Sequence, residues 1–262
     1  MKKRKEIATV FSQHKIGEEI FDMWVQTDMA NDAKAGQFIS IYPQDMSKLL
    51  PRPISICEID KNKEKIRFVY RVVGEGTKEF SSYQKGNAIF LLGNLGNGYP
   101  IAEGLHKKVL LLGGGMGIPP LLQLAKELKA NDHKIKIDIV LGFREKHTFL
   151  TEDFKKYGNV YIATDDGSIG TKGTVLTAVD ELDLESEVIF ACGPTPMLRA
   201  IQDYAKKQQK KAYLSLEERM ACGVGACLGC VCQTNKEDEH SHVKNQRICV
   251  EGPVFEAQEV VI

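Results

Sequence analysis

The arrangement of cysteines near the end of the sequence is the feature that most restricts the fold. Cys222, Cys227 and Cys230 follow the spacing C-x4-C-x2-C, and Cys249 stands further along. This is the plant-type spacing for a two-iron two-sulfur cluster, which takes three closely spaced thiolates and a fourth from a distant position. Glycines between the cysteines let the backbone turn tightly and point N–H groups at sulfur. The pattern predicts an iron–sulfur domain over residues 212–262.

The same segment contains other residues that bind metals. Zinc also takes thiolates, but a structural zinc site usually offers two close ligand pairs rather than a triplet and one distant cysteine. Cys232 would face the same side of an extended segment as Cys230, and we expect it to be a buried residue that is not a ligand. His240 and His242 lie in a polar run, where solvated loop histidines are expected. The predicted metal ligands are therefore Cys222, Cys227, Cys230 and Cys249.

Cysteine usage and charge indicate the class of protein. Five of the seven cysteines lie between positions 222 and 249, which favours metal binding in a cytosolic protein over a disulfide framework. Lys+Arg and Asp+Glu each number 35, so there is no electrostatic basis for binding nucleic acid or an anionic membrane. The basic start is not followed by the apolar core of a signal peptide, and no apolar run is long enough to span a bilayer. We expect a cytoplasmic protein.

Residues 1–100 have the pattern of a small β domain. Short β-rich runs, several of them alternating between apolar and polar residues, are separated by turn residues and predict strands at 6–12, 20–25, 36–42, 54–59 and 65–72. A short helix is expected at 77–83, and residues 92–100 are expected to form a glycine-rich loop near the domain boundary. Strands at this spacing are typical of a closed barrel or a sandwich.

Residues 101–211 change to a different period. Lys108–Leu112 is a continuous apolar run bounded by glycines, as in a buried parallel strand, and 119–129 has helical spacing. Further strands are expected at 135–141, 160–164 and 187–191, with helices at 175–181 and 197–207. Strands that alternate with helices predict a doubly wound sheet. The expected fold is therefore α+β and multidomain, with an antiparallel β-barrel, a central doubly wound α/β nucleotide-binding domain and a small iron–sulfur domain.

Two strand exits in the central domain have features of a phosphate site. Gly113, Gly114, Gly115 and Gly117 lie between a strand and a helix that begins with proline. Such a turn presents free N–H groups and the positive end of a helix dipole to a diphosphate. Cys192, Gly193 and Pro194 form a second strand exit, which belongs to the same sheet edge. The glycines depart from G-x-G-x-x-G, and each segment alone is also compatible with a plain turn or a small core residue.

The barrel contains two segments whose chemistry alone is ambiguous. Arg52 is followed by Ser55 on an expected strand, and a guanidinium offers a fixed fork of donors to phosphate. A surface arginine between two prolines at the start of a strand is the interpretation that chemistry alone favours. Gly76 and Thr77 either form a plain turn or place N–H groups on phosphate at the start of a helix.

In this order, the Arg-Pro-x-Ser segment, the glycine-rich strand exit, the Cys-Gly-Pro segment and the cysteine motif resemble the ferredoxin–NADP reductase-like family. The whole chain resembles, within it, the electron transfer subunits of NAD-linked (class B) dihydroorotate dehydrogenases. The resemblance implies FAD, a two-iron two-sulfur cluster and NAD as co-substrate. It further implies that the barrel (1–100) binds FAD, that 101–211 binds NAD, and that the cofactor-binding residues are Arg52, Pro53, Ile54, Ser55, Val69, Tyr70, Arg71, Gly76, Thr77, Gly113, Gly114, Gly115, Gly117, Cys192, Gly193 and Pro194.

The resemblance also implies an electron relay and a partner. In that family a flavin-containing catalytic subunit oxidises dihydroorotate to orotate for pyrimidine biosynthesis, in a heterotetramer with two copies of each subunit. Three modules use all 262 residues and leave no domain for oxidising an organic substrate. Alternatives are a subunit of another NAD(P)H-dependent complex, such as a transhydrogenase or hydrogenase, and a zinc-binding interaction module. The nucleotide preference stays open, because no acidic residue clearly follows the second strand of the central domain and Arg144 does.

Overall fold

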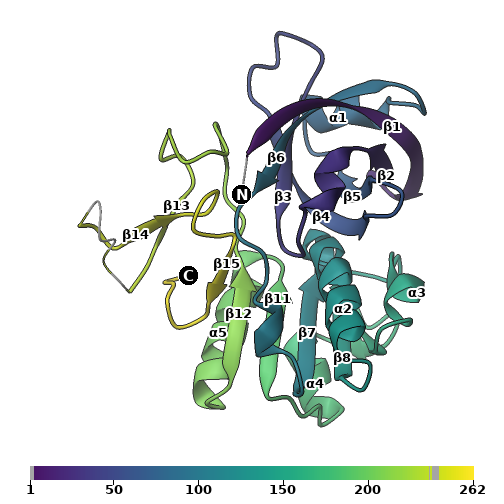
Figure 1. Ribbon diagram of the computed structural model, residues 1–262. Helices are drawn as coiled ribbons and strands as arrows, with labels where there is room; N and C mark the ends of the chain where they lie inside the picture. Colours follow the sequence, from purple (N-terminus) through teal and green to yellow (C-terminus); the bar gives the residue numbers. More distant parts are fainter. Residues whose placement is uncertain (1–2, 236, 238–241) are drawn as a thin grey trace.

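The computed structural model of the chain describes residues 3–235, 237 and 242–262. It contains a closed barrel, a large central sheet with helices on both faces, and a small two-stranded sheet beside the cysteines (Figure 1). In the part of the chain that is described, no helix combines the length and the apolar character needed to cross a membrane.

The barrel is antiparallel and closes in the order β1-β2-β5-β4-β3-β6. Its interior is filled by alternate apolar side chains, among them the fully buried Met23, Ile56 and Phe68. The expected strands are present, and the barrel alternative is confirmed over the sandwich. Its elements are β1 (Arg4–Gly17), β2 (Ile20–Gln26), a 3-10 helix (Asp28–Asn31), β3 (Phe38–Tyr42), β4 (Arg52–Asp60), β5 (Lys65–Arg71), α1 (Glu75–Ser81) and β6 (Ala88–Leu95).

The last barrel strand corrects one expectation. Residues 92–95, expected to begin a glycine-rich loop, are the end of β6, which pairs with both β1 and β3. The glycine at 93 serves packing, since a Cβ there would lie 2.8 Å from the side chain of Ile39. A glycine in a strand can mark a close approach of another element as well as a turn.

The central sheet has seven strands in the order β10-β9-β8-β7-β11-β12-β15. All are parallel except the edge strand β15. The switch in strand order lies between β7 and β11, so the doubly wound architecture is confirmed. The elements are β7 (Lys108–Gly114), α2 (Pro119–Asn131), β8 (Lys136–Phe143), α3 (Thr151–Phe154), β9 (Asn159–Thr164), β10 (Thr171–Lys172), α4 (Val175–Glu181), β11 (Val188–Cys192), α5 (Thr195–Lys207), β12 (Lys211–Ser215) and β15 (Val254–Glu256), with 3-10 turns at Ile101–Glu103 and Gly115–Gly117.

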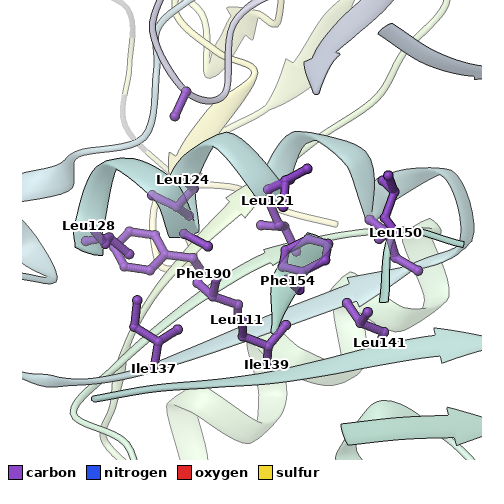
Figure 2. Packing of buried hydrophobic residues seen from close by; sticks show 14 of the residues in the cluster. Leu111, Leu121, Leu124, Leu128, Ile137, Ile139, Leu141, Leu150, Phe154 and Phe190 are labelled. Carbon is purple, nitrogen blue, oxygen red and sulfur yellow. The ribbon is translucent and has the colours of Figure 1, made fainter. Parts of the chain in front are cut away.

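Helix α2 covers one face of this sheet and also contacts the barrel. Leu121, Leu124 and Leu128 point down onto Leu111 and Phe190 of the strands (Figure 2). Leu, Ile and Phe side chains removed from water in this way each contribute about 1.5–3 kcal/mol. Helices α4 and α5 cover the opposite face.

The barrel and the central sheet are joined by buried polar contacts. Gln123 of α2 accepts a hydrogen bond from the N–H of Ile59 at 2.8 Å, and Lys126 Nζ lies 2.9 Å from Glu58. Arg67 in β5 donates to both oxygens of Asp22 at 3.0 and 2.8 Å. The same guanidinium lies 3.5 Å from Asp153 in α3, so one arginine connects the two units.

The segment that carries the cysteines packs against both units. The small sheet consists of β13 (Val231–Gln233) and β14 (Asn245–Arg247). Behind it, Cys230, Cys249 and Phe255 pack with Phe38 and Leu95 of the barrel. Strand β15 then pairs with β12, so residues after 211 complete the edge of the central sheet.

Candidate functional site

The cysteine loop is shaped by glycines and by N–H groups that point at sulfur. Gly223 and Gly225 have φ values of 67° and 92°, in the left-handed region where a side chain is disfavoured. The N–H of Val224 lies 3.4 Å from Cys222 Sγ, and the N–H of Gly229 lies 3.4 Å from Cys227 Sγ. Such donors favour thiolate over thiol, and thiolate is the metal-binding form.

The loop brings the four predicted ligands together as two pairs. The side chain of Cys227 is hydrogen-bonded to that of Cys222, and the side chain of Cys230 to that of Cys249. The N–H of Ile248 donates to the carbonyl of Cys230 at 2.9 Å, which places Cys249 beside the motif. Cys230 and Cys249 are buried, whereas Cys222 is half-buried and Cys227 is exposed. Four sulfurs supplied as two pairs fit a cluster in which two cysteines bind each of two irons.

The pKa values of Cys222 and Cys249 are shifted in opposite directions. Burial acts to raise the pKa of Cys222, but hydrogen bonds from the N–H of Val224 and from Cys227 outweigh it and lower the pKa to about 6. Burial, together with the neighbouring Cys230, raises the pKa of Cys249 to about 12. To act as a metal ligand, an uncharged Cys249 thiol in this buried site would have to lose its proton as metal binds.

The other candidate ligands lie apart from these pairs. Cys232 is half-buried on β13, where burial raises its pKa to about 11, and it pairs with Gln246 of β14. His242 is exposed and lies 3.6 Å from Glu237. His240 lies outside the described residues. Within the described chain, no group of three or more Cys, His, Asp or Glu side chains surrounds a single ion position.

The cysteine loop lies directly against the barrel. A Cβ on Gly223 would lie 3.0 Å from Ser40 Oγ and 3.2 Å from Leu95 Cδ1, so β3 and β6 form the floor of the loop. Arg247 donates to the carbonyl of Gly225 at 3.3 Å and holds the outer side. The hydroxyl of Ser40 is buried and makes no hydrogen bond in the described structure. The sequence pattern gave no signal for Ser40, which lies inside a plain apolar strand.

On the barrel, strands β4 and β5 stop pairing with each other before one end, and we call the unpaired stretch between them the slot. They pair from Asp60↔Lys65 as far as Ile56↔Phe68. Beyond that point, residues 52–55 pair with β3 and residues 69–71 pair with β2. Each strand therefore turns an edge of polar backbone groups toward the gap, with Ser55 and Arg71 exposed beside it. Backbone groups of this kind need hydrogen-bond partners, and a planar ring with polar edges could supply them.

The side chains expected to line the slot are distributed unevenly. Tyr70 is 2% exposed, and its ring lies inside the barrel, where its hydroxyl donates to Gln13 at 2.8 Å. Val69 is buried toward the central sheet. Only the main chain of these two residues is available at the slot. The sequence pattern does not distinguish main-chain from side-chain roles on a strand.

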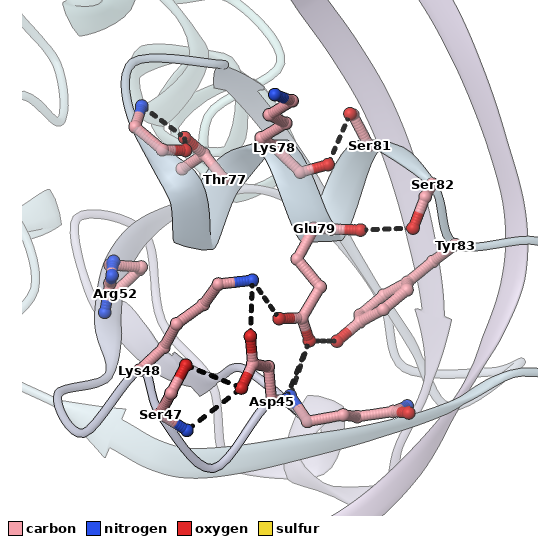
Figure 3. A network of polar contacts seen from close by, with 12 residues as sticks. Asp45, Ser47, Lys48, Arg52, Thr77, Lys78, Glu79, Ser81, Ser82 and Tyr83 are labelled. Atoms are coloured by element: carbon pink, nitrogen blue, oxygen red, sulfur yellow. Dashed lines mark hydrogen bonds and ion pairs between the residues drawn. The ribbon is translucent and has the colours of Figure 1, made fainter.

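Next to the slot, Arg52 covers the first turn of α1. A Cβ on Gly76 would lie 2.5 Å from Arg52 Nε, so the absent side chain makes a cradle under the guanidinium. Thr77 caps the helix, with its hydroxyl accepting from the N–H of Val73 at 2.9 Å and of Gly74 at 3.2 Å (Figure 3). Arg52 and the backbone around Gly76 present donors to the same space, as a phosphate group requires.

The two strand exits of the central sheet meet as expected. A Cβ on Gly117 would lie 2.3 Å from the carbonyl carbon of Cys192, so only glycine permits the contact. A Cβ on Gly114 would lie 2.5 Å from Met197 Sδ, so a side chain is disfavoured at this position as well. Pro119 begins α2 directly behind the glycines. The result is one continuous glycine-lined edge at the switch in strand order, where ligands bind in such sheets.

Cys192 has polar neighbours that the sequence did not reveal. Burial of its thiol raises its pKa to about 12, and Ser215, its partner in the ladder between β11 and β12, forms a hydrogen bond with it. Tyr99 lies at the same place with its ring against Phe190. These residues come from segments without a nucleotide-binding motif, and only the pairing of β11 with β12 identifies them.

Family models match two parts of the chain. The model described as "Iron-sulfur cluster binding domain of dihydroorotate dehydrogenase B" matches residues 217–261. The model described as "Oxidoreductase NAD-binding domain" matches residues 111–203. These ranges contain the four paired cysteines and the two strand exits.

Full-length relatives extend the match to the barrel. A protein of Bacillus pumilus is 43% identical, with 99% of each chain covered, and one of Streptococcus mutans is 41% identical, with 98% of each covered. Both are named "Dihydroorotate dehydrogenase B (NAD(+)), electron transfer subunit". A solved structure of an NADH-dependent reduced ferredoxin-NADP oxidoreductase is 30% identical with a TM-score of 0.86, over 98% of this chain and 90% of that one. The flavohemoglobin of Malassezia yamatoensis shares the fold alone, with 18% identity and a TM-score of 0.67 over 79% of this chain and 57% of that one.

Proposed function

Because the chain belongs to the family of electron transfer subunits of NAD-linked dihydroorotate dehydrogenase B, we propose that it carries electrons between a flavin-containing catalytic subunit and NAD. The partner oxidises dihydroorotate to orotate in pyrimidine biosynthesis. When bound, FAD exchanges a hydride with nicotinamide and single electrons with an iron–sulfur cluster, which connects two-electron to one-electron chemistry. The residues of this chain bind, orient and shield those groups.

The barrel is proposed to hold FAD in the slot between β4 and β5. Arg52 would neutralise the diphosphate together with the N–H groups at Gly76 and Thr77, and Ser55 would hydrogen-bond the ring. Pro53, Ile54 and the strand end formed by Val69, Tyr70 and Arg71 would line the two sides. The separated strand edges and the cradle under Arg52 support this assignment.

The glycine-lined edge of the central sheet is proposed to bind NAD. N–H groups of Gly113, Gly114, Gly115 and Gly117 would contact the diphosphate at the start of α2. Cys192, Gly193 and Pro194 would position the nicotinamide half, with Cys192 held in place by Ser215. Because Gly117 lies directly against the backbone of Cys192, the two strand exits would contact the same dinucleotide.

The paired cysteines Cys222, Cys227, Cys230 and Cys249 are proposed as ligands of the two-iron two-sulfur cluster. The N–H groups of Val224 and Gly229 would stabilise negative charge on sulfur. We further propose residues 1–100, 101–211 and 212–262 as the FAD, NAD and cluster units, two copies of each subunit in the complex, and a cytoplasmic location.

The packing of the cysteine loop on the barrel is the observation that carries the proposal. Gly223 lies on β3 and β6, so sulfur ligands stand beside the unit that would hold the flavin. Electron transfer requires this proximity, whereas a zinc-binding interaction module does not. A transhydrogenase or hydrogenase subunit would use the same arrangement, but the names of the full-length relatives favour the dihydroorotate complex.

The test is to purify the full chain together with the proteins that bind it in its own cell. We expect a yellow-brown complex that releases FAD on denaturation and contains about two irons per copy of this chain. Dihydroorotate should reduce it, and NAD should reoxidise it. A colourless protein with stoichiometric zinc would rule the proposal out. Co-purification with a hydrogenase in place of a dihydroorotate-oxidising partner would instead identify the chain as the electron transfer subunit of a hydrogenase.

A further inference from the structure

The loop between β3 and β4 exposes large apolar side chains on the barrel. Met46, Leu49 and Leu50 are 87%, 83% and 51% exposed. They occur within five consecutive residues, 46–50. Single exposed apolar residues are ordinary, but a group on one loop marks a surface that another molecule covers.

This loop is held in place by a network of polar contacts. Lys48 Nζ lies 2.8 Å from Glu79 and 3.3 Å from Asp45 (Figure 3). Glu79 also accepts a hydrogen bond from the hydroxyl of Tyr83 at 2.7 Å. Lys48 and Glu79 are only 18% and 14% exposed at their side chains. The apolar tip is therefore presented by a fixed loop, so its exposure is not the result of a disordered connection.

The loop is continuous with the phosphate cradle. Arg52 Nη1 donates to the carbonyl of Leu50, and the same guanidinium lies over Gly76. The residues follow one direction along the chain: Ser55 at the slot, Arg52 at the cradle, then Leu50 and Leu49. A flavin dinucleotide has the same linear order of ring, diphosphate and adenosine. A dinucleotide laid along these residues, with its ring at the slot and its diphosphate at the cradle, would bring its adenosine half to the loop.

We infer that Met46, Leu49 and Leu50 form the surface that binds the adenosine half of FAD, and that this loop selects FAD over FMN. The inference rests on the proposed binding of FAD to the barrel. Adenine presents two apolar faces, and a bound dinucleotide would cover side chains that are otherwise in water. Lys48 is a positioning residue here, because its ion pair with Glu79 fixes the loop.

The test compares flavin binding by the full chain and a double variant, Leu49→Ser with Leu50→Ser. Each protein, freed of flavin, is titrated with FAD and separately with FMN, and flavin fluorescence is recorded. We expect the dissociation constant for FAD to rise about tenfold and that for FMN to be unchanged, because FMN lacks the adenosine. Met46→Ser should weaken FAD binding by a smaller factor in the same sense. Ile7→Ser is the matched control, since Ile7 is 67% exposed on β1, across the barrel from β4.

The outcomes separate the inference from the proposed function. Unchanged FAD affinity in the double variant overturns the inference, and would leave the apolar tip as a surface for a protein partner. Equal weakening of FAD and FMN also overturns it, because the loss would then come from the part that both flavins share. If the unaltered chain binds neither flavin, the proposed function itself fails, and the inference fails with it.

Discussion

At the scale of single residues, the site depends on glycines whose lack of a side chain lets another part of the chain approach closely. Gly76 leaves room for the guanidinium of Arg52, Gly117 for the backbone of Cys192, and Gly223 for the barrel under the cysteine loop. The sequence shows these positions as glycines, but glycine is also the ordinary residue of turns. Which glycines serve a close contact becomes clear only when the facing residue is known, and for Gly223 that residue, Ser40, lies more than a hundred positions away.

Gly76→Ala tests the phosphate cradle. The new methyl group would meet the flexible end of Arg52, so the arginine should move while the fold is kept. We expect FAD affinity to fall about tenfold, equivalent to about 1.4 kcal/mol, with little change in melting temperature. Flavin fluorescence titration and thermal unfolding measure the two quantities. Gly74→Ala is the control, because nothing lies within 4 Å of its added Cβ, and an equal loss there would refute the specific role of Arg52.

Cys227→Ser and Cys232→Ser test the choice of ligands. Replacing Cys227 should remove the cluster and leave much of the FAD, because the barrel does not depend on this exposed side chain. Replacing Cys232 should leave the cluster assembled. Electron paramagnetic resonance of the reduced proteins measures this. A full cluster signal after the first change would refute Cys227 as a ligand. Loss of the signal after the second change would mean that the third ligand of the motif is Cys232.

At the scale of elements, most strands and helices could be predicted because they carry a clear period. The apolar run of β7 and the helical spacing of α2 are unambiguous, and α4 has the expected limits. The pattern failed for β6, whose Gly93 resembles a turn residue but packs on Ile39. It also gave no sign that β4 and β5 separate, since both continue as regular strands in other pairings. The slot is a property of register, which no single strand encodes.

Arg67→Met tests the contact between barrel and central sheet. The guanidinium is 11% exposed at the side chain and faces the carboxylates of Asp22, Glu58 and Asp153. Its removal leaves buried negative charge without a partner, and we expect a loss of about 3–5 kcal/mol in unfolding free energy. Denaturant titration measures it. Lys63→Met, which breaks an exposed pair with Asp60 at 3.9 Å, should cost under about 1 kcal/mol. Similar losses in the two variants would contradict the argument.

At the scale of the whole molecule, the three units are joined by their hydrophobic contacts. Phe38 and Leu95 of the barrel, Cys230 and Cys249 of the motif, and Phe255 of β15 form one buried cluster. Motifs allowed the nucleotide and iron–sulfur segments to be recognised separately. Their mutual arrangement was beyond prediction, because the contacts that set it are ordinary apolar residues and one mid-strand arginine.

Phe255→Ala tests this shared cluster. Phe255 is 4% exposed, and truncating a buried phenylalanine costs about 3–5 kcal/mol. We expect lower stability to denaturant together with faster loss of the visible cluster absorption on standing. Val261→Ala, at a residue that is 50% exposed, is the control and should change neither. If the variant is destabilised but keeps its cluster as long as the unaltered protein, the packing of Phe255 does not determine how long the cluster is retained.

The pairing of β15 with β12 has a consequence for how the protein is made. During synthesis the barrel and six of the seven strands of the central sheet, together with three of the four paired cysteines, leave the ribosome before Cys249 and β15. Domains generally fold as units in the order of synthesis. The last proposed ligand, Cys249, and the last strand then arrive almost together, since only a few residues separate them. A nascent chain therefore exposes an open sheet edge and an incomplete set of thiols during the same interval. Docking of the segment that contains Cys249 and β15 covers the edge and completes the set of thiols in one step.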